Sequence, residues 1–450
     1  MTIRTGRGIS IASGLVLAGL LLSACAGQEV ILPGIREDVR GVLQNPEPIP
    51  AAQTQAPEVN RAAPIRLPAQ RNNAAWPQRA VSPLYRTDNA TLGGSLQLAW
   101  STDIGDGDSR RFRISADPVV AGGRVFTMDS RSLVSATSAS GQHLWSHDVK
   151  PAQARAGSAG GGALAYGDGR LFVTSGYGRL VALDPETGAE LWTQDLDASA
   201  TGNPTYFGGL VYLVAGDRTA WAVEADTGRI RWQNDSIEDV SNIYGGPAPA
   251  LTEDLAIFGY GSGEVQAAFR KGGLTRWTAS VVGAREGRAR SMIDDITGDP
   301  VVDGNRVYVG NQSGRLVALN RDSGERIWTA KFGTMGPVWP AGGSIFLVSD
   351  LGELLRVDAS DGSRIWGVEL PGFVRDRVRK RAEIYTHHGP ILAGNRIIVA
   401  SGDGYLRQFD PVSGRLLAAT ELPGGATSAP VVAGGTLYVV SKRGQLLAFR

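Results

Sequence analysis

Short apolar runs recur along most of the chain, and Gly, Asn, Asp and Ser separate them. The stretch from Asp299 to Trp328 shows the pattern most clearly, with three β-branched and aliphatic runs and a closing run that ends on Trp328. Runs of this kind between turn residues are typical of β-strands joined by tight turns. The stretch therefore predicts one four-stranded antiparallel unit in about thirty residues.

This unit is repeated. A Gly followed four residues later by Trp recurs at Gly141/Trp145, Gly188/Trp192, Gly228/Trp232, Gly273/Trp277, Gly324/Trp328 and Gly362/Trp366. A seventh copy has Gly414 with Ala418 in the Trp position. Repeats with a period of about 20 to 50 residues indicate solenoids, propellers or arrays.

The two ends of the chain complete one another. An eighth copy begins at Ala429 and stops at Arg450 without its fourth strand, whereas the run Ser95–Trp100 is a Trp strand with no repeat before it. Joining the ends removes the open sheet edges. We therefore predict an all-β fold, an eight-bladed β-propeller over residues 83–450, closed by pairing of the Trp100 strand with the C-terminal strands. An open solenoid would need capping elements that this sequence lacks.

One tryptophan per blade, at a fixed offset from a turn glycine, favours a structural role between blades. The predicted structural set is Trp100, Trp145, Trp192, Trp232, Trp277, Trp328 and Trp366. Trp221 and Trp339 fall outside this register, and we expect them to face solvent or a partner.

The start of the chain is typical of a targeting segment. Residues 1–24 combine a basic start with a short apolar run, and they end Leu22-Ser23-Ala24-Cys25 like a bacterial lipobox. The pattern predicts lipid modification of Cys25, the only cysteine of the chain; an ordinary secretory signal is the alternative. Residues 25–82 are rich in Pro and Ala and predict a flexible linker between the lipid anchor and the propeller.

Charge and composition exclude several function classes. Removal of residues 1–24 takes away two Arg, so the net charge moves from +1 to −1 and gives no electrostatic reason to bind nucleic acid. A single cysteine leaves no disulfide or Cys-based metal site.

Candidate catalytic groups are few. The acidic pair Asp106-Gly-Asp108 lacks the rest of a calcium loop and predicts a turn. His143 and His147 flank Trp145 in a predicted strand, and His387-His388 predict a solvated loop pair. We therefore predict no catalytic residue, no metal site and no cofactor.

Two long connections between predicted blades carry charge beside apolar residues, which is typical of partner surfaces. Residues 278–298 contain Arg290 and then Ile293-Asp294-Asp295. Residues 367–388 hold a second set, which is basic: Arg375, Arg377, Arg379, Lys380 and Arg381 beside Phe373, Val374 and Val378. Solvated loops without a partner are the alternative.

The run from Ala182 to Trp192, Ala-Leu-Asp-Pro-Glu-Thr-Gly-Ala-Glu-Leu-Trp, resembles the tryptophan-docking repeat of quinoprotein (PQQ-type) propellers. With the lipobox and a single eight-bladed body, the chain resembles the BamB-like lipoproteins of the outer-membrane β-barrel assembly (BAM) machinery. That resemblance implies a non-enzymatic scaffold, anchored in the outer membrane and facing the periplasm. It also implies assistance to nascent outer-membrane β-barrel proteins. A periplasmic PQQ-dependent oxidoreductase and an envelope propeller with another partner are the alternatives.

The resemblance also implies a partner site for the periplasmic (POTRA) domains of BamA, beside other BAM subunits. The matching positions here lie in two loops, Ser241–Gly245 and Ile293–Asp295. Asp294 and Asp295 keep the acidic character of the family. Ile243 corresponds to a family Leu. Tyr244 stands where the family has Arg, so a different residue can provide the dominant contact here.

Overall fold

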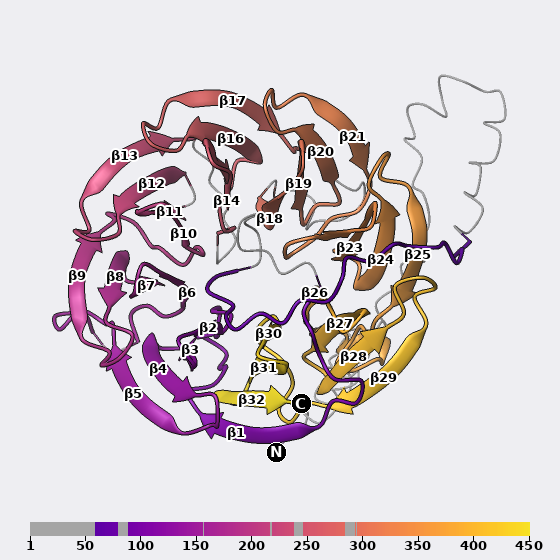
Figure 1. The fold of residues 1–450 in the computed structure, drawn as a ribbon, viewed down its shortest axis with the longest axis horizontal. Coiled ribbons are helices and arrows are strands. Elements are labelled where there is room, and N and C mark those ends of the chain that lie inside the picture. The colour runs from indigo at the N-terminus through magenta and orange to yellow at the C-terminus, as the bar shows by residue number, and fades with distance from the viewer. Residues whose placement is uncertain are drawn as a thin grey trace, which may run out of the picture. The chain divides into compact units, whose positions relative to one another are not determined.

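The computed structural model describes residues 59–79, 89–155, 157–216, 218–237, 246–283, 293 and 295–450. The described strands form eight four-stranded antiparallel sheets, arranged as blades around a common axis (Figure 1). The predicted eight-bladed propeller is confirmed.

The first four blades follow the chain from inner to outer strand. Blade 1 contains β2 (Val119–Ala121), β3 (Arg124–Met128), β4 (Leu133–Ser138) and β5 (His143–Asp148). Blade 2 contains β6 (Gly162–Gly167), β7 (Arg170–Ser175), β8 (Arg179–Leu183) and β9 (Glu190–Asp195). Blade 3 contains β10 (Thr205–Phe207), β11 (Leu210–Ala215), β12 (Thr219–Glu224) and β13 (Ile230–Asp235). Blade 4 contains β14 (Ala250–Leu251), β15 (Leu255–Gly259), β16 (Glu264–Phe269) and β17 (Thr275–Ser280).

The other four blades complete the ring. Blade 5 contains β18 (Ile296–Asp303), β19 (Arg306–Asn311), β20 (Leu316–Asn320) and β21 (Arg326–Ala330). Blade 6 contains β22 (Trp339–Ala341), β23 (Ser344–Val348), β24 (Glu353–Asp358) and β25 (Arg364–Glu369). Blade 7 contains β26 (His387–Ala393), β27 (Arg396–Ser401), β28 (Tyr405–Phe409) and β29 (Leu416–Glu421). Blade 8 contains β30 (Val431–Ala433), β31 (Thr436–Ser441), β32 (Gln445–Phe449) and β1 (Leu98–Asp103).

The first and last strands meet in blade 8. β1 pairs antiparallel with β32, and Trp100 lies opposite Ala448. The predicted closure is therefore confirmed, and strands from the two ends of the described body stabilise each other. A 3-10 turn, η3 (Val378–Lys380), lies between β25 and β26. Among the described residues, no helix is long and apolar enough to cross a membrane.

Each blade tryptophan packs on the turn glycine of the following blade. A Cβ added at Gly188 would lie 2.5 Å from the Trp145 ring, and one at Gly228 would lie 2.6 Å from the Trp192 ring. The Trp145 indole N–H also donates to the carbonyl of Pro185 at 3.1 Å. The Gly-to-Trp spacing of the sequence therefore reflects contacts between neighbouring blades and not within one blade.

In most blades, the third strand carries an alanine opposite the blade tryptophan. Ala182 faces Trp192, and a β-bulge follows directly. Blades 6 and 7 depart from this rule, because Arg356 faces Trp366 and Gln408 faces Ala418. Both polar side chains are buried.

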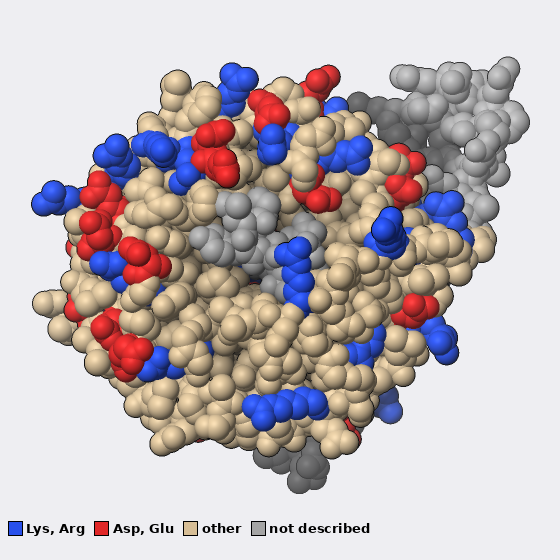
Figure 2. Space-filling model, in the orientation of Figure 1, with Lys and Arg blue, Asp and Glu red and all other residues tan. Residues whose placement is uncertain are grey.

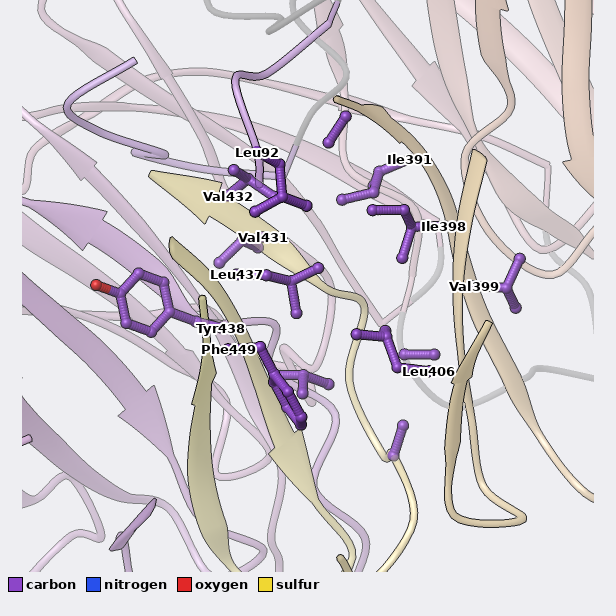
Figure 3. Close-up of a cluster of buried hydrophobic side chains, with 14 of the residues drawn as sticks. Leu92, Ile391, Ile398, Val399, Leu406, Val431, Val432, Leu437, Tyr438 and Phe449 are labelled. Atoms are coloured by element: carbon purple, nitrogen blue, oxygen red, sulfur yellow. The ribbon is translucent and has the colours of Figure 1, made fainter. Parts of the chain in front are cut away.

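Hydrophobic clusters fill the space between blades. The largest one joins blades 6, 7 and 8, and Figure 3 shows its part around Ile398, Leu406, Leu437 and Phe449, all of which are fully buried. Leu92, which precedes β1, packs into the same cluster. Burial of this apolar surface is the main term that stabilises the closed ring.

Residues 59–79, here called the N-terminal strap, pack on the propeller instead of belonging to the predicted linker. In Figure 1 the strap is the indigo trace that runs inward from the blade of β25. Backbone hydrogen bonds tie Arg61 to Ile365 and Trp76 to Val120. The body extends from Val59 to Arg450. The predicted boundary at Ser82 is thus wrong for this segment, because its backbone groups find partners along the propeller face.

The two tryptophans outside the repeat register are also buried. Trp221 is 3% exposed and Trp339 is 2% exposed, so the prediction that they face solvent is wrong. Trp221 lies in β12, whose two faces are covered by neighbouring blades. Trp339 stacks on Trp76 of the strap, with ring centroids 6.2 Å apart and planes 21° apart.

Candidate functional site

The inner strands begin around the propeller axis, where two of them carry an Asp-Pro pair. The Asp117 carboxylate accepts a hydrogen bond from the backbone N–H of Ala429 at 2.7 Å. The Asp299 carboxylate accepts one from Ala248 at 2.8 Å. Each aspartate therefore joins its own blade to the blade before it.

Arg79, the last described residue of the strap, lies between these two aspartates. Its Nε is 2.6 Å from Asp299, and its Nη1 is 3.7 Å from Asp117. Blades 1 and 5 are opposite in a ring of eight, so this one guanidinium spans the axis. Burial raises the pKa of the Asp299 carboxyl, and the charge of Arg79 opposes that rise.

A cavity of about 310 Å³ lies beside this ion pair. The starts of six inner strands contribute to its wall. Its described acidic, basic and imidazole side chains are Arg79, Asp117, Asp299, Asp350, His387 and His388. Three carboxylates face one guanidinium in this set. The described lining is therefore acidic on balance.

His387 and His388 lie in β26 at this cavity and not in a solvated loop, which corrects the prediction. His387 lies within hydrogen-bond distance of the Ser401 hydroxyl, 2.8 Å, and of the Pro371 carbonyl, 3.0 Å. Burial lowers the pKa of His387 and lowers that of His388 to about 4. Both residues line the cavity, and the lowered pKa values favour the neutral form of each ring near pH 7.

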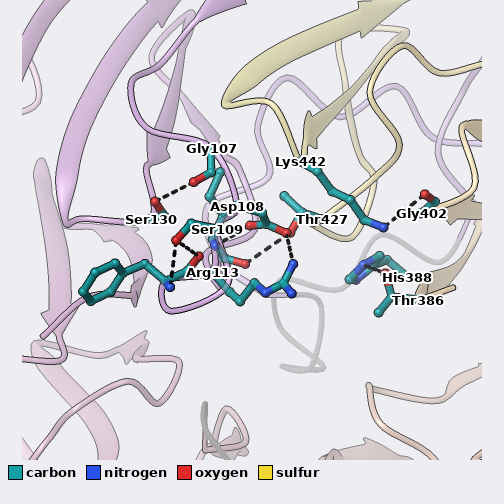
Figure 4. Close-up of polar contacts among 12 residues, drawn as sticks. Gly107, Asp108, Ser109, Arg113, Ser130, Thr386, His388, Gly402, Thr427 and Lys442 are labelled. Carbon is teal, nitrogen blue, oxygen red and sulfur yellow. Dashed lines mark hydrogen bonds and ion pairs between the residues drawn. The ribbon is translucent and has the colours of Figure 1, made fainter. Parts of the chain in front are cut away.

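The acidic pair Asp106 and Asp108 does not converge on a common point. Asp106 pairs with Arg131 at 2.9 Å. Asp108 instead accepts hydrogen bonds from the Ile114 N–H at 2.8 Å and the Thr427 hydroxyl at 3.0 Å (Figure 4). Within the described residues, no group of three or more His, Asp, Glu or Cys side chains is placed to hold a metal ion.

The donor set at the axis does not fit the PQQ cofactor that the propeller repeat suggests. That cofactor carries three carboxylates and needs cations around it. Arg79 is already paired with Asp299, and the other described charges of the wall are carboxylates.

The predicted partner residues are placed only in part. Ile293 is half-buried, and its carbonyl accepts a hydrogen bond from the Ser313 hydroxyl. Asp295 is 5% exposed, so its carboxylate is not offered to a partner in this structure. The remaining predicted residues lie outside the described ones: Cys25, Ile243, Tyr244, Arg290 and Asp294.

The basic connection between β25 and β26 forms a defined structure. We call residues 372–385 the basic finger. Its two sides are joined by hydrogen bonds from the Tyr385 N–H to the Gly372 carbonyl, 2.8 Å, and from the Val374 N–H to the Glu383 carbonyl, 3.0 Å. The turn η3 forms its tip. Sequence reasoning found the charges of this segment but not its hairpin form.

The family model described as "Outer membrane protein assembly factor BamB" matches residues 130–368 and 375–450. The protein of that name from Shewanella oneidensis is 24% identical over 360 residues, which cover 78% of this chain and 88% of that protein. The one from Yersinia pestis is 26% identical over 379 residues, 82% of this chain and 92% of that protein.

Solved structures show the same fold. The crystal structure of BamB from Moraxella catarrhalis has a TM-score of 0.65 at 19% identity and covers 79% of this chain and 100% of that chain. The quinohemoprotein alcohol dehydrogenase from Comamonas testosteroni has a TM-score of 0.62 at 17% identity, and covers 84% of this chain and 80% of that chain. An assembly factor and a dehydrogenase thus share this propeller, so the fold alone does not choose between them.

Proposed function

The chain belongs to the family of the outer membrane protein assembly factor BamB, and from this premise we propose that it is a non-enzymatic scaffold of the BAM complex. It binds the periplasmic (POTRA) domains of BamA and assists insertion of β-barrel proteins into the outer membrane. The lipid on Cys25 anchors it there, with the propeller in the periplasm. The observation that carries the proposal is the family match, which extends over most of the blades.

The connections between blades 3 and 4 and between blades 4 and 5 supply the partner surface. Ile243 and Tyr244 belong to the first connection, and Arg290, Ile293 and Asp294 belong to the second. Asp294 provides the acidic contact in this proposal, since the neighbouring Asp295 is buried. The alternative, a PQQ-dependent oxidoreductase, is less well supported because the described axis lining is acidic.

The test is capture of the BamA periplasmic domains by a soluble form of residues 26–450, which keeps the N-terminal strap. We expect capture by the parent and loss of capture by Asp294→Arg. The matched control is Asp322→Arg, which makes the same charge change at a carboxylate that is 61% exposed on the turn between β20 and β21. Capture by all three proteins would support the scaffold role but show that BamA binds somewhere other than Asp294. Failure of the parent to capture would overturn the BamA assignment.

A further inference from the structure

The basic finger concentrates positive charge on a protein that is nearly neutral overall. Residues 372–385 contain five cations and two acids, whereas the whole chain has a net charge of +1. On the face of the propeller drawn in Figure 2, acidic and basic side chains instead lie interspersed along the rim. The finger therefore differs from the mixed surface that maintains solubility.

Most of the finger cations form no ion pair within the described part of the chain. Arg381 pairs with Asp376 at 2.8 Å, and its guanidinium lies 4.9 Å from the Phe373 ring centroid. The other four form no ion pair with any described residue: Arg375, Arg377, Arg379 and Lys380. All four are exposed, so they are free to bind anions outside the protein.

Apolar side chains stand among these charges. Val378, at the tip, is 67% exposed, and Phe373 at the base is 41% exposed. Exposed apolar residues flanked by Lys and Arg are the combination by which peripheral proteins hold a membrane interface, since the apolar groups enter the headgroup region and the cations meet phosphates.

The finger also follows a strand that contacts the first described residues of the N-terminal strap. The Asn60 side chain donates to the Gly367 carbonyl of β25 at 2.8 Å, and its carbonyl oxygen accepts from the Gly367 N–H at 2.9 Å. Gly372 begins the finger five residues later, within about 17 Å along an extended chain. The described body therefore begins beside β25, the strand that leads into the finger.

We propose that the basic finger is a membrane-contact element that binds the anionic phosphate headgroups of a phospholipid surface. The tether and the finger then meet the same membrane, and together they orient the propeller instead of leaving it free on a flexible chain. Along the chain the finger follows blade 6, whereas the proposed BamA loops follow blades 3 and 4.

The experiment is vesicle co-flotation with unlipidated residues 26–450. The vesicles are phosphatidylcholine alone or phosphatidylcholine with phosphatidylglycerol. We expect binding only to the anionic vesicles, and release as NaCl is raised. Inorganic phosphate at millimolar concentration is added in a parallel arm. If the finger binds a lipid surface and also uses Val378, the protein stays on the vesicles. If the finger is a site for free phosphate, the added phosphate releases the protein.

The test variant replaces Arg375, Arg377, Arg379 and Lys380 by Gln. We expect at least about tenfold weaker binding to anionic vesicles, because each cation near such a surface contributes favourably. The matched control makes the same four charge changes at exposed positions elsewhere, Arg229, Lys271, Arg276 and Arg415, and should bind like the parent. Val378→Ser should weaken binding at an unchanged charge.

Three results would overturn the proposal. They are equal binding by the finger variant and the parent, equal binding to neutral and anionic vesicles, and displacement by inorganic phosphate. A protein that binds vesicles but does not capture BamA would support the membrane contact and not the scaffold role. A protein that captures BamA but does not bind vesicles would support the scaffold role and not the membrane contact.

Discussion

The Arg79 guanidinium lies 2.6 Å from the Asp299 carboxylate, and this contact joins the N-terminal strap to the inner strand of blade 5. The Asp299 side chain is 1% exposed, and its other oxygen caps the Ala248 N–H of blade 4. Arg79 also faces Asp117 of blade 1. A segment that the sequence assigns to a linker thus neutralises acids at the axis of the propeller.

Loss of this cation should destabilise the fold. Arg79→Met leaves Asp299 buried beside Asp117 without its charge partner, so we expect the free energy of unfolding to fall by about 3 kcal/mol. The double variant Arg79→Met/Asp299→Asn should lose less than the sum of the single variants, by about 1 kcal/mol or more, because the amide removes the unpaired charge and still caps Ala248. Urea unfolding of all four proteins measures this coupling.

The control for the axis pair is Arg170→Met, which breaks a pair with Asp168, whose side chain is 56% exposed. An exposed pair contributes little, so the control should change stability by less than about 1 kcal/mol. Strict additivity of the Arg79 and Asp299 variants would contradict the prediction.

Arg356 should hold the strap on the propeller. Its guanidinium is buried and donates to the carbonyls of Ala63 at 2.6 Å, Pro64 at 3.3 Å and Pro411 at 3.1 Å. Arg356→Lys keeps the charge, but one ammonium cannot reach all of these acceptors. We expect trypsin to cut the strap at least about tenfold faster, because opening of the strap becomes more favourable by about 1.4 kcal/mol or more.

The cleavage sites are read by mass spectrometry at Arg61, Arg66 and Arg71. Arg170→Lys is the matched substitution outside the strap contacts, and its cleavage rate in the strap should equal that of the parent. Unchanged protection in Arg356→Lys would mean that Trp76 and the backbone contacts alone hold the strap.

The blades could be predicted because their information is local. The strands, the turns and the Gly-to-Trp spacing of each repeat all lie within one continuous stretch of the sequence. The strap could not, since its order depends on groups far away: Arg356 and Trp339 act as its partners. The signals were a lone Trp76 in a Pro-rich segment and an Arg at a third-strand position that is Ala in most blades. Trp221 was misplaced because both faces of a blade strand are covered, so a residue outside the repeat register is still buried.

The site was predicted less well for the same reason. The Asp-Pro pairs at Asp117 and Asp299 begin inner strands of different blades, and only the closed ring brings them to one axis. The two histidines follow directly on a long connection, but β26 starts at His387 and holds them against the cavity. Charge in the basic finger was visible, whereas its hairpin form depends on hydrogen bonds between its two sides.

Two blade tryptophans should differ in their response to the same substitution. Trp145 donates its indole N–H to the Pro185 carbonyl at 3.1 Å, whereas the buried Trp100 N–H has no acceptor among the described residues. Both rings pack on a turn glycine of the next blade, Gly188 and Gly141. Trp145→Phe should therefore cost about 1 kcal/mol more than Trp100→Phe, because it also leaves a carbonyl unpaired. Thermal and urea unfolding of the two variants give this difference, and equal losses would contradict it.

His388 should make the fold less stable in mild acid. Its pKa is lowered from 6.5 to about 4 by burial, and the charge of Asp117 only partly offsets that effect. A depressed histidine pKa means that the unfolded chain binds the proton more tightly, so stability is kept above about pH 6.5 and lost as the pH falls towards 4. This one group should remove about 2 kcal/mol of unfolding free energy between pH 7 and pH 5.

His388→Gln should show a correspondingly smaller loss over that interval in urea unfolding, whereas His143→Gln, at an exposed position of β5, should follow the parent. An identical pH dependence in the parent and His388→Gln would show that the acid sensitivity of the fold arises elsewhere, with the neighbouring His387 as the next group to replace.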